Sequence, residues 1–291
     1  MIQLLANGIV AGSAFALVGL GFALVYNTTK FFHFAHGALY TLGAYLALFF
    51  WQHLGWPPLP SGLLAVLLTG AVGWLFGRFV FQSLRWRQAG PLICLLASLG
   101  TMIALQNLIA LLAGEESRTL RRAAVIEGFD LLGARITQVQ AVIALVCAGL
   151  YAGTWWAISY TRMGRSLRAV ANDVDLATVV GVNTDRAILL TFVAGAGLAA
   201  VAGILVGCDT DLTPAMGFQA LLMGVVAVVC GGLKTIVGAA VGGLFIGIVQ
   251  SFGVAYMPTQ WKDAIVFTVL ILFLIFRPLG ILGSPLHRAA K

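Results

Sequence analysis

The chain has 291 residues, of which 60% are hydrophobic and 9% are charged, and its formal net charge at pH 7 is +7. Soluble domains carry about 25% charged and about 45–50% apolar residues, so this composition excludes an ordinary water-soluble domain and indicates a bilayer as the solvent. The basic residues lie mainly between apolar runs, which is the distribution of membrane loops rather than of a nucleic-acid surface. We therefore expect an integral membrane protein that binds lipid and no nucleic acid.

A helix that crosses the hydrocarbon core needs about 20 mostly apolar residues. Runs of this kind predict an all-α polytopic bundle of about nine (8–10) transmembrane helices in a single domain, residues 1–291. The predicted spans are Leu4–Tyr26, Ala38–Gln52, Leu59–Gln82, Pro91–Ala113, Gln138–Tyr160, Ile188–Gly207, Phe218–Gly231, Val237–Val254 and Ala264–Phe276. The seventh and eighth are either two separate spans or a re-entrant pair covered by protein.

The distribution of Lys and Arg predicts the orientation of these spans. With the C-terminus in the cytoplasm and the N-terminus outside, most basic residues lie in cytoplasmic loops, as the positive-inside rule requires. The cytoplasmic set is Lys30, Arg78, Arg85, Arg87, Arg162, Arg165, Arg168, Arg186, Lys234, Arg277, Arg288 and Lys291, and the external set is Arg118, Arg121, Arg122, Arg135 and Lys262. The reversed orientation would place the larger set outside.

The polar segment from Asn27 to Gly37 interrupts the apolar pattern between the first two spans. Breaks of this kind at membrane depth often line solute paths, but a simple interfacial turn with an aromatic belt fits the segment equally well. His33 and His36 lie three residues apart without a third acid or His nearby, so we predict no metal site. We predict instead that His33, His36 and Gly37 lie along a translocation path.

The span Pro91–Ala113 holds more polar residues than its neighbours. They are Ser98, Thr101, Gln106 and Asn107. Such groups often serve only as contacts between helices, each contributing about 0.6 kcal/mol. Their concentration nevertheless makes this helix the first candidate for lining a path. Because the predicted spans hold no central charge, a zwitterion or a neutral solute is favoured over an ion.

Two loops are long enough to do more than connect spans. The external loop, Gly114–Thr137, carries charges of both signs and is expected to be a solvated cap. The cytoplasmic loop, Thr161–Ala187, contains apolar residues at helical spacing and predicts an amphipathic helix over Leu167–Val180. Gly181 is placed to end that helix, and Asn183, Thr184 or Asp185 to begin the next. The amphipathic helix either lies on anionic lipid or forms a rigid contact for a soluble partner.

Several motifs together carry a family resemblance. They are Phe34-Ala35-His36-Gly37, Leu42-Gly43-Ala44-Tyr45, Ser98-Leu99-Gly100 with Gln106-Asn107, Arg162-Met163-Gly164-Arg165, Gly181-Val182-Asn183-Thr184-Asp185-Arg186, Ala199-Ala200-Val201-Ala202-Gly203 and Pro278-Leu279-Gly280-Ile281-Leu282-Gly283. In this order and over the whole chain, the sequence resembles the branched-chain amino acid ABC importer permeases of the LivH type, in the hydrophobic amino acid uptake group. It departs from the family pattern at His33, Asn172 and Leu233-Lys234.

The resemblance implies a permease subunit that moves branched-chain or other hydrophobic amino acids by ATP-driven alternating access in the inner membrane of a prokaryote. It also implies two cytoplasmic ATPase subunits, a second permease subunit that is normally a different chain, and an extracytoplasmic solute-binding protein. Asp175-Leu176-Ala177 followed by Gly181 is similar to the loop by which such permeases engage the ATPase. The expected coupling residues are thus Asp175, Ala177, Gly181, Asn183, Asp185 and Arg186.

Three alternatives remain at this stage. Related permeases are associated with urea or short amides, a stand-alone secondary transporter would normally show a charged coupling residue within a span, and an intramembrane enzyme would need a nucleophile beside His33 or His36. We expect no catalytic residues on this chain. The stretch Gly231-Gly232-Leu233-Lys234-Thr235 lacks the spacing of a phosphate-binding loop, so ATP and Mg²⁺ are expected on the partner ATPase.

Overall fold

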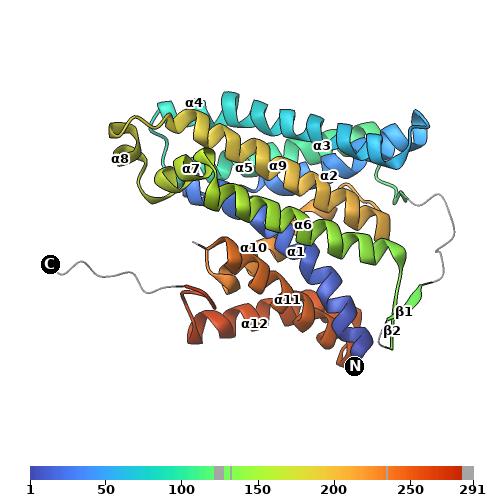
Figure 1. Ribbon diagram of the computed structural model, residues 1–291. Helices are drawn as coiled ribbons and strands as arrows, with labels where there is room; N and C mark the ends of the chain where they lie inside the picture. The colour runs from blue at the N-terminus through green and yellow to red at the C-terminus, as the bar shows by residue number, and fades with distance from the viewer. Residues whose placement is uncertain (121–127, 132, 234, 284–291) are drawn as a thin grey trace.

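The computed structural model describes residues 1–120, 128–131, 133–233 and 235–283. It is a bundle of helices with a small β-hairpin at one end (Figure 1). The elements are α1 (Ile2–Thr29), α2 (Ala35–Leu48), η1 (Phe49–His53), α3 (Pro58–Leu75), η2 (Phe76–Phe81), α4 (Gln82–Trp86), α5 (Pro91–Ala113), β1 (Phe129–Leu131), β2 (Ala134–Ile136), α6 (Gln138–Tyr160), α7 (Arg162–Asn172), α8 (Val174–Val179), α9 (Thr184–Asp209), α10 (Met216–Gly231), α11 (Ile236–Tyr256), η3 (Thr259–Trp261) and α12 (Lys262–Phe276).

Within the described residues, seven helical segments are long and apolar enough to cross a membrane, and α10 is apolar but shorter. All nine predicted spans are helical, which confirms the prediction of an all-α polytopic membrane bundle. The described residues also contain the antiparallel pair β1–β2, which lies in the predicted loop Gly114–Thr137, and an isolated bridge between Arg118 and Leu212. Residues 121–127 and 132 of that loop, and the basic residues Arg121, Arg122, Lys234, Arg288 and Lys291, lie outside the described residues.

The two ends of the bundle differ in what they carry. The N-terminus and the β-hairpin lie at one end, which we call the hairpin end (Figure 1). At the opposite end, the α8 end, lie α4, α7 and α8.

Helix α1 runs through the centre of the bundle because small residues let its neighbours approach its backbone. A Cβ added at Gly12 would lie 2.8 Å from the carbonyl oxygen of Gly243 on α11. Farther along α1, a Cβ at Gly21 would lie 3.0 Å from the carbonyl oxygen of Gly195 on α9. Without a hydrophobic driving force between helices in lipid, such close backbone packing supplies the attraction.

The chain is broken in two places inside the bundle, once between α1 and α2 and once between α9 and α10. In the first turn of α2, His36 Nε2 lies 3.2 Å from the carbonyl oxygen of Val18 on α1. At 1.5 Å per residue, Val18 is about 16 Å from the C-terminal end of α1, so α2 begins deep in the bundle. A Cβ at Gly37 would lie 2.6 Å from the carbonyl oxygen of Gly217, so α10 begins at the same depth. The N-termini of two helices that begin inside the bundle, α2 and α10, therefore meet in the interior.

The first break is narrower than the sequence predicts. It covers residues 30–34, because α1 continues to Thr29 and α2 already begins at Ala35. The prediction of an interruption that reaches Gly37 is wrong. The residues on either side of the break are helical, because helical hydrogen bonds satisfy their backbone N–H and C=O groups even where the side chains are polar.

The predicted helix over Leu167–Val180 is also not continuous, since it consists of α7 and α8 with a break at Asp173. Asp173 has an extended backbone (φ −154°, ψ 116°), and its Oδ1 accepts hydrogen bonds from the backbone N–H groups of Asp175 and Leu176, both at 2.9 Å. An Asp that caps a new helix in this way competes with continuing the old one. The helical periodicity of the apolar residues gave no sign of this.

The predicted end of α8 and start of α9 are confirmed. Gly181 has φ +84° and follows the last turn of α8, a backbone conformation that glycine adopts without strain. Asn183 Oδ1 accepts a hydrogen bond of 2.9 Å from the backbone N–H of Arg186 and caps α9. The turn between the two helices is therefore short and fixed at both sides.

Candidate functional site

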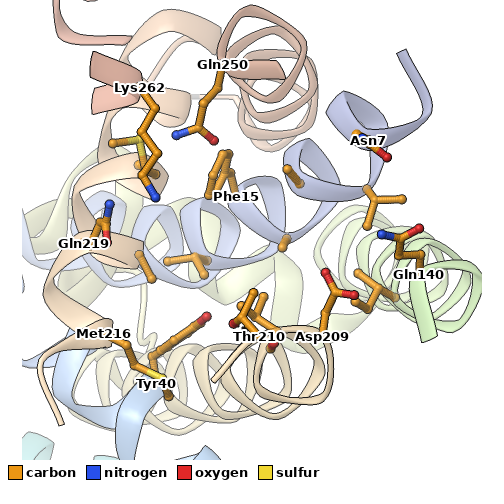
Figure 2. A pocket seen from close by; sticks show the side chains of 18 of the residues that line it. Asn7, Phe15, Tyr40, Gln140, Asp209, Thr210, Met216, Gln219, Gln250 and Lys262 are labelled. Atoms are coloured by element: carbon orange, nitrogen blue, oxygen red, sulfur yellow. Dashed lines mark hydrogen bonds between the residues drawn. The ribbon is translucent and has the colours of Figure 1, made fainter. Parts of the chain in front are cut away.

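A cavity of about 560 Å³ opens at the hairpin end of the bundle. Its wall is formed by the ends of α6, α9 and α12 and by the interior faces of α1, α2, α10 and α11 (Figure 2). The polar lining residues are Asn7, Tyr40, Gln140, Asp209, Thr210, Asp211, Thr213, Gln219, Gln250 and Lys262, and the apolar ones include Phe15, Val18, Ile143, Met216 and Met223. The volume falls within the range of about 300–1,000 Å³ typical of small-molecule sites.

Charged side chains of opposite sign lie on different sides of this cavity. Lys262, the first residue of α12, lies near Gln219 and Gln250, whereas Asp209, the last residue of α9, lies on the side of Gln140 and Asn7 (Figure 2). Gln219 Nε2 donates a 2.9 Å hydrogen bond to Asp263 Oδ2, which ties the first turns of α10 and α12 together.

None of the described residues that line this cavity is among the predicted path residues. His33 is buried and packs edge-on against Phe31, Phe81 and Phe192, with ring centroids 5.0–6.0 Å apart. His36 is also buried, against α1, and Gly37 lies against α10. These three residues shape the contact between the broken helices.

Ser98 on α5 forms hydrogen bonds with the backbone of the first break. Its Oγ accepts a 3.1 Å hydrogen bond from the backbone N–H of Phe34, and its hydroxyl proton is shared between the carbonyl oxygens of Phe32 at 3.1 Å and Leu95 at 2.8 Å. The backbone groups of Phe34 and Phe32 belong to the non-helical segment and have no helical partner. Burying them unpaired in an apolar interior would cost several kcal/mol, about 1–3 kcal/mol for each group.

The other polar residues of α5 lie farther out. Thr101 is half-buried and bonds to the carbonyl oxygen of Ala97, and Asn107 is exposed and bonds to that of Ile103. Gln106 is half-buried. The structure therefore separates Ser98, which faces the first break, from a group of α5 residues near the outer surface of the bundle.

At the α8 end, α8 presents an apolar surface to solvent. The exposed fractions of Leu176, Val179 and Val180 are 62%, 83% and 68%. We call these three residues the α8 tip. Ala177 lies on the opposite side of the same helix and is buried against α7 and α9. Among the predicted coupling residues, Ala177 therefore holds α8 in place, while Asp175, Gly181, Asn183 and Arg186 are exposed around the tip.

Asp185 joins this region to the α3–η2–α4 helix. Its Oδ1 lies 3.1 Å from Arg85 Nη1, and Arg85 Nη2 donates a 3.2 Å hydrogen bond to Thr184 Oγ1. The first turn of α9 is thus attached to α4 by a pair of side chains that are each about one-third exposed, 36% and 38%.

The contribution of this ion pair to stability is expected to be small, because exposed pairs contribute about 0–1 kcal/mol to the free energy of unfolding. We predict that a double-mutant cycle of Arg85→Gln and Asp185→Asn gives a coupling free energy below about 1 kcal/mol. Unfolding of the purified protein in detergent, followed by tryptophan fluorescence in urea, measures it. A coupling above about 2 kcal/mol would show that the pair is shielded from water.

Little in the amino-acid sequence indicates which residues form the cavity. Asn7 and Gln250 are polar residues within predicted spans, while Asp209 and Lys262 fall just beyond span ends and look like ordinary loop charges. The signal in the sequence was that both charges lie at span ends that the basic residues predict to face the outside. Likewise, Leu176 and Val179 belong to an apolar pattern that predicts a buried face just as well as an exposed one.

A helical membrane bundle in which two helices begin in the interior, with a polar cavity at one end, is the architecture of a membrane permease. Comparison with known proteins agrees. Residues 4–274 match the family model described as branched-chain amino acid transport system, permease component. The chain belongs to this family.

Named relatives match over nearly the whole chain. The high-affinity branched-chain amino acid transport system permease protein LivH of Escherichia coli is 37% identical over 98% of this chain and 96% of LivH. BraD of Pseudomonas aeruginosa, described in the same words, is 35% identical over the same shares. A probable LivH of Methanocaldococcus jannaschii is 27% identical over 97% of this chain and 92% of its own length. No solved structure matches the chain.

Proposed function

We propose that this chain is the transmembrane permease subunit of an ATP-driven importer for branched-chain amino acids. The observation that carries the proposal is the match over 98% of the chain to permeases whose names state that transport. The complete importer would also contain ATPase subunits that bind ATP and Mg²⁺, a second permease chain and an extracytoplasmic solute-binding protein.

We further propose that the α8 end faces the cytoplasm and the hairpin end the outside, which places the N-terminus outside. The α8 end carries a cluster of basic residues, whereas few described basic residues lie at the hairpin end. Basic residues in short loops are retained on the cytoplasmic side. The cluster comprises Arg85, Arg87, Arg162, Arg165, Arg168 and Arg186.

The α8 tip is the proposed contact with an ATPase subunit. Three exposed apolar side chains on one short helix are a poor surface to leave in water, and apolar anchors surrounded by polar residues are typical of protein interfaces. Asp175, Gly181, Asn183 and Arg186 would form the polar rim. Since α9 begins only a few residues after α8 and packs against α1, α2 and α3, movement of the tip would reach the bundle core.

The outer face of α5 is the proposed contact with the second permease chain. Polar side chains that face lipid are costly, and Thr101, Gln106 and Asn107 lie at or near this face. Covered by a second permease, they would line a path between the two chains. His33, His36, Gly37 and Ser98 would control that path indirectly by holding the first break in shape.

ATP binding and hydrolysis would favour alternately an outward-open and an inward-open arrangement of the two permeases. A partner can shift this equilibrium only by binding one arrangement more tightly than the other. The two short helices that begin inside the bundle, α2 and α10, meet through Gly37 and Gly217 and are the elements best placed to move relative to each other.

Reconstitution tests the proposal. The permease is co-expressed with the chains encoded beside it, and the complex is placed in proteoliposomes with its binding protein. We expect uptake of radiolabelled leucine that requires ATP on the side of the α8 end. Uptake that proceeds without the ATPase and follows an ion gradient would contradict the proposal and indicate a secondary transporter.

A further inference from the structure

The cavity at the hairpin end has a positive side and a negative side. Lys262 and Gln219 line one side, and Asp209 and Gln140 the other, so that an ammonium group and carboxylate oxygens lie across the cavity from each other (Figure 2). Both charged residues are partly buried. A ligand with separated positive and negative groups would interact favourably with both sides.

The positive side is held in place by several elements. Lys262 begins α12, and the neighbouring Asp263 accepts the 2.9 Å hydrogen bond from Gln219 on the first turn of α10. The cavity therefore also reaches the N-terminus of α10, where Thr213 and Met216 line it. The partial positive charge of a helix N-terminus adds to that of the Lys262 ammonium group.

Between the two charged sides, the lining is apolar. Phe15 lies in the middle of the view, between Lys262 and Asp209 (Figure 2). Phe15, Val10 and Ala220 are partly exposed apolar residues of the lining, whereas Val18, Ile143 and Met223 are almost fully buried and belong to the core of the bundle. An apolar side chain of a ligand would be removed from water here, which is favourable by about 25 cal/mol per Å².

We propose that this cavity binds the transported solute as a zwitterionic amino acid within a single permease chain. Lys262 binds the α-carboxylate, Asp209 binds the α-ammonium group, and the surface around Phe15 receives the apolar side chain. The inference rests on the proposed function and adds to it a site that the solute occupies on entering from the hairpin end, before it reaches the α5 face.

Kinetics of the reconstituted importer with increasing concentrations of loaded binding protein test the site. Lys262→Gln and Asp209→Asn should each lower kcat for leucine by about tenfold, because each removes a charged hydrogen-bonding partner of the solute. The KM for loaded binding protein should stay unchanged. Lys262→Arg and Asp209→Glu, which keep the charges, should restore most of the rate and show that the neutral variants are not simply misfolded.

Two matched controls come from the β-hairpin at the same end of the protein. Asp130 and Arg135 are exposed, oppose each other in the strand register and lie outside the cavity. Asp130→Asn and Arg135→Gln remove the same charges and should leave kcat unchanged.

The outcomes separate the site from other roles of the two charges. A higher KM with an unchanged kcat would show that Lys262 and Asp209 serve docking of the binding protein and would overturn the inference. Unchanged kinetics in both neutral variants would overturn it as well, while leaving the proposed function intact. A wild-type complex that imports no leucine would instead refute the proposed function, and the inference with it.

Discussion

Replacing Val179 by Asp is expected to abolish ATP-driven uptake while the permease still inserts into the membrane and folds. Val179 is 83% exposed, so the carboxylate is solvated in the isolated chain and costs little stability there. In a complex with the ATPase, the same carboxylate would be buried among apolar groups without a partner. That penalty is about 3–5 kcal/mol, which corresponds to a loss of binding of more than a hundredfold.

The measurement is co-purification of the ATPase with the permease, together with leucine uptake in proteoliposomes. Asn172→Asp is the matched control, because it adds the same charge at an exposed position at the end of α7, outside the α8 tip. If Val179→Asp retained the ATPase and normal uptake, the α8 tip would not be the contact with the ATPase. A helix that lies on the lipid surface would then be the better interpretation of α8.

The second large effect is expected at Gly37, where α2 contacts α10. A Cβ there would lie 2.6 Å from the carbonyl oxygen of Gly217 and 3.2 Å from the Leu221 side chain. Because the nearest obstacle is backbone, Gly37→Val can be accommodated only if α2 and α10 separate. Overpacking of a rigid interior costs about 1–3 kcal/mol, and separation would also disturb the hydrogen bond of His36 to α1.

We expect Gly37→Val to lower the unfolding temperature of the purified permease by several degrees, measured by tryptophan fluorescence in detergent, and to reduce uptake. Gly149→Val on α6 supplies the control, since no atom lies within 4 Å of an added Cβ there and the helix is otherwise continuous. Equal stability of the two variants would mean that α2 and α10 are not closely packed at this point in the membrane.

The two regions tested by these variants lie at different depths but share one helix. Helix α9 starts beside the α8 tip, passes α1 at Gly195 and ends at Asp209 on the cavity wall. A displacement imposed at its first turn would therefore reach both the centre of the bundle and the hairpin end. This continuity gives a physical link between the proposed ATPase contact at one end and the proposed solute cavity at the other.

Local features of the fold follow from the amino-acid sequence alone. The apolar runs predicted an all-α membrane bundle, and each of the seven described helical segments long enough to cross a membrane falls on a predicted span, because a run of about 20 apolar residues satisfies its backbone internally whatever its neighbours are. The end of α8 at Gly181 and the start of α9 at Asn183 were also predictable, since a left-handed glycine and an Asn cap act within a few residues.

Which distant residues contact one another depends on how the helices pack in three dimensions. Ser98 pairs with backbone groups of Phe32 and Phe34, and Asp209 and Lys262 line one cavity although 53 positions separate their numbers in the chain. The break at Asp173 is a local feature instead, because the Asp173 side chain caps α8, but the periodicity of the apolar residues did not indicate it. Hydropathy reports only that a residue prefers lipid or water, whereas a site forms where helix packing brings distant polar groups together.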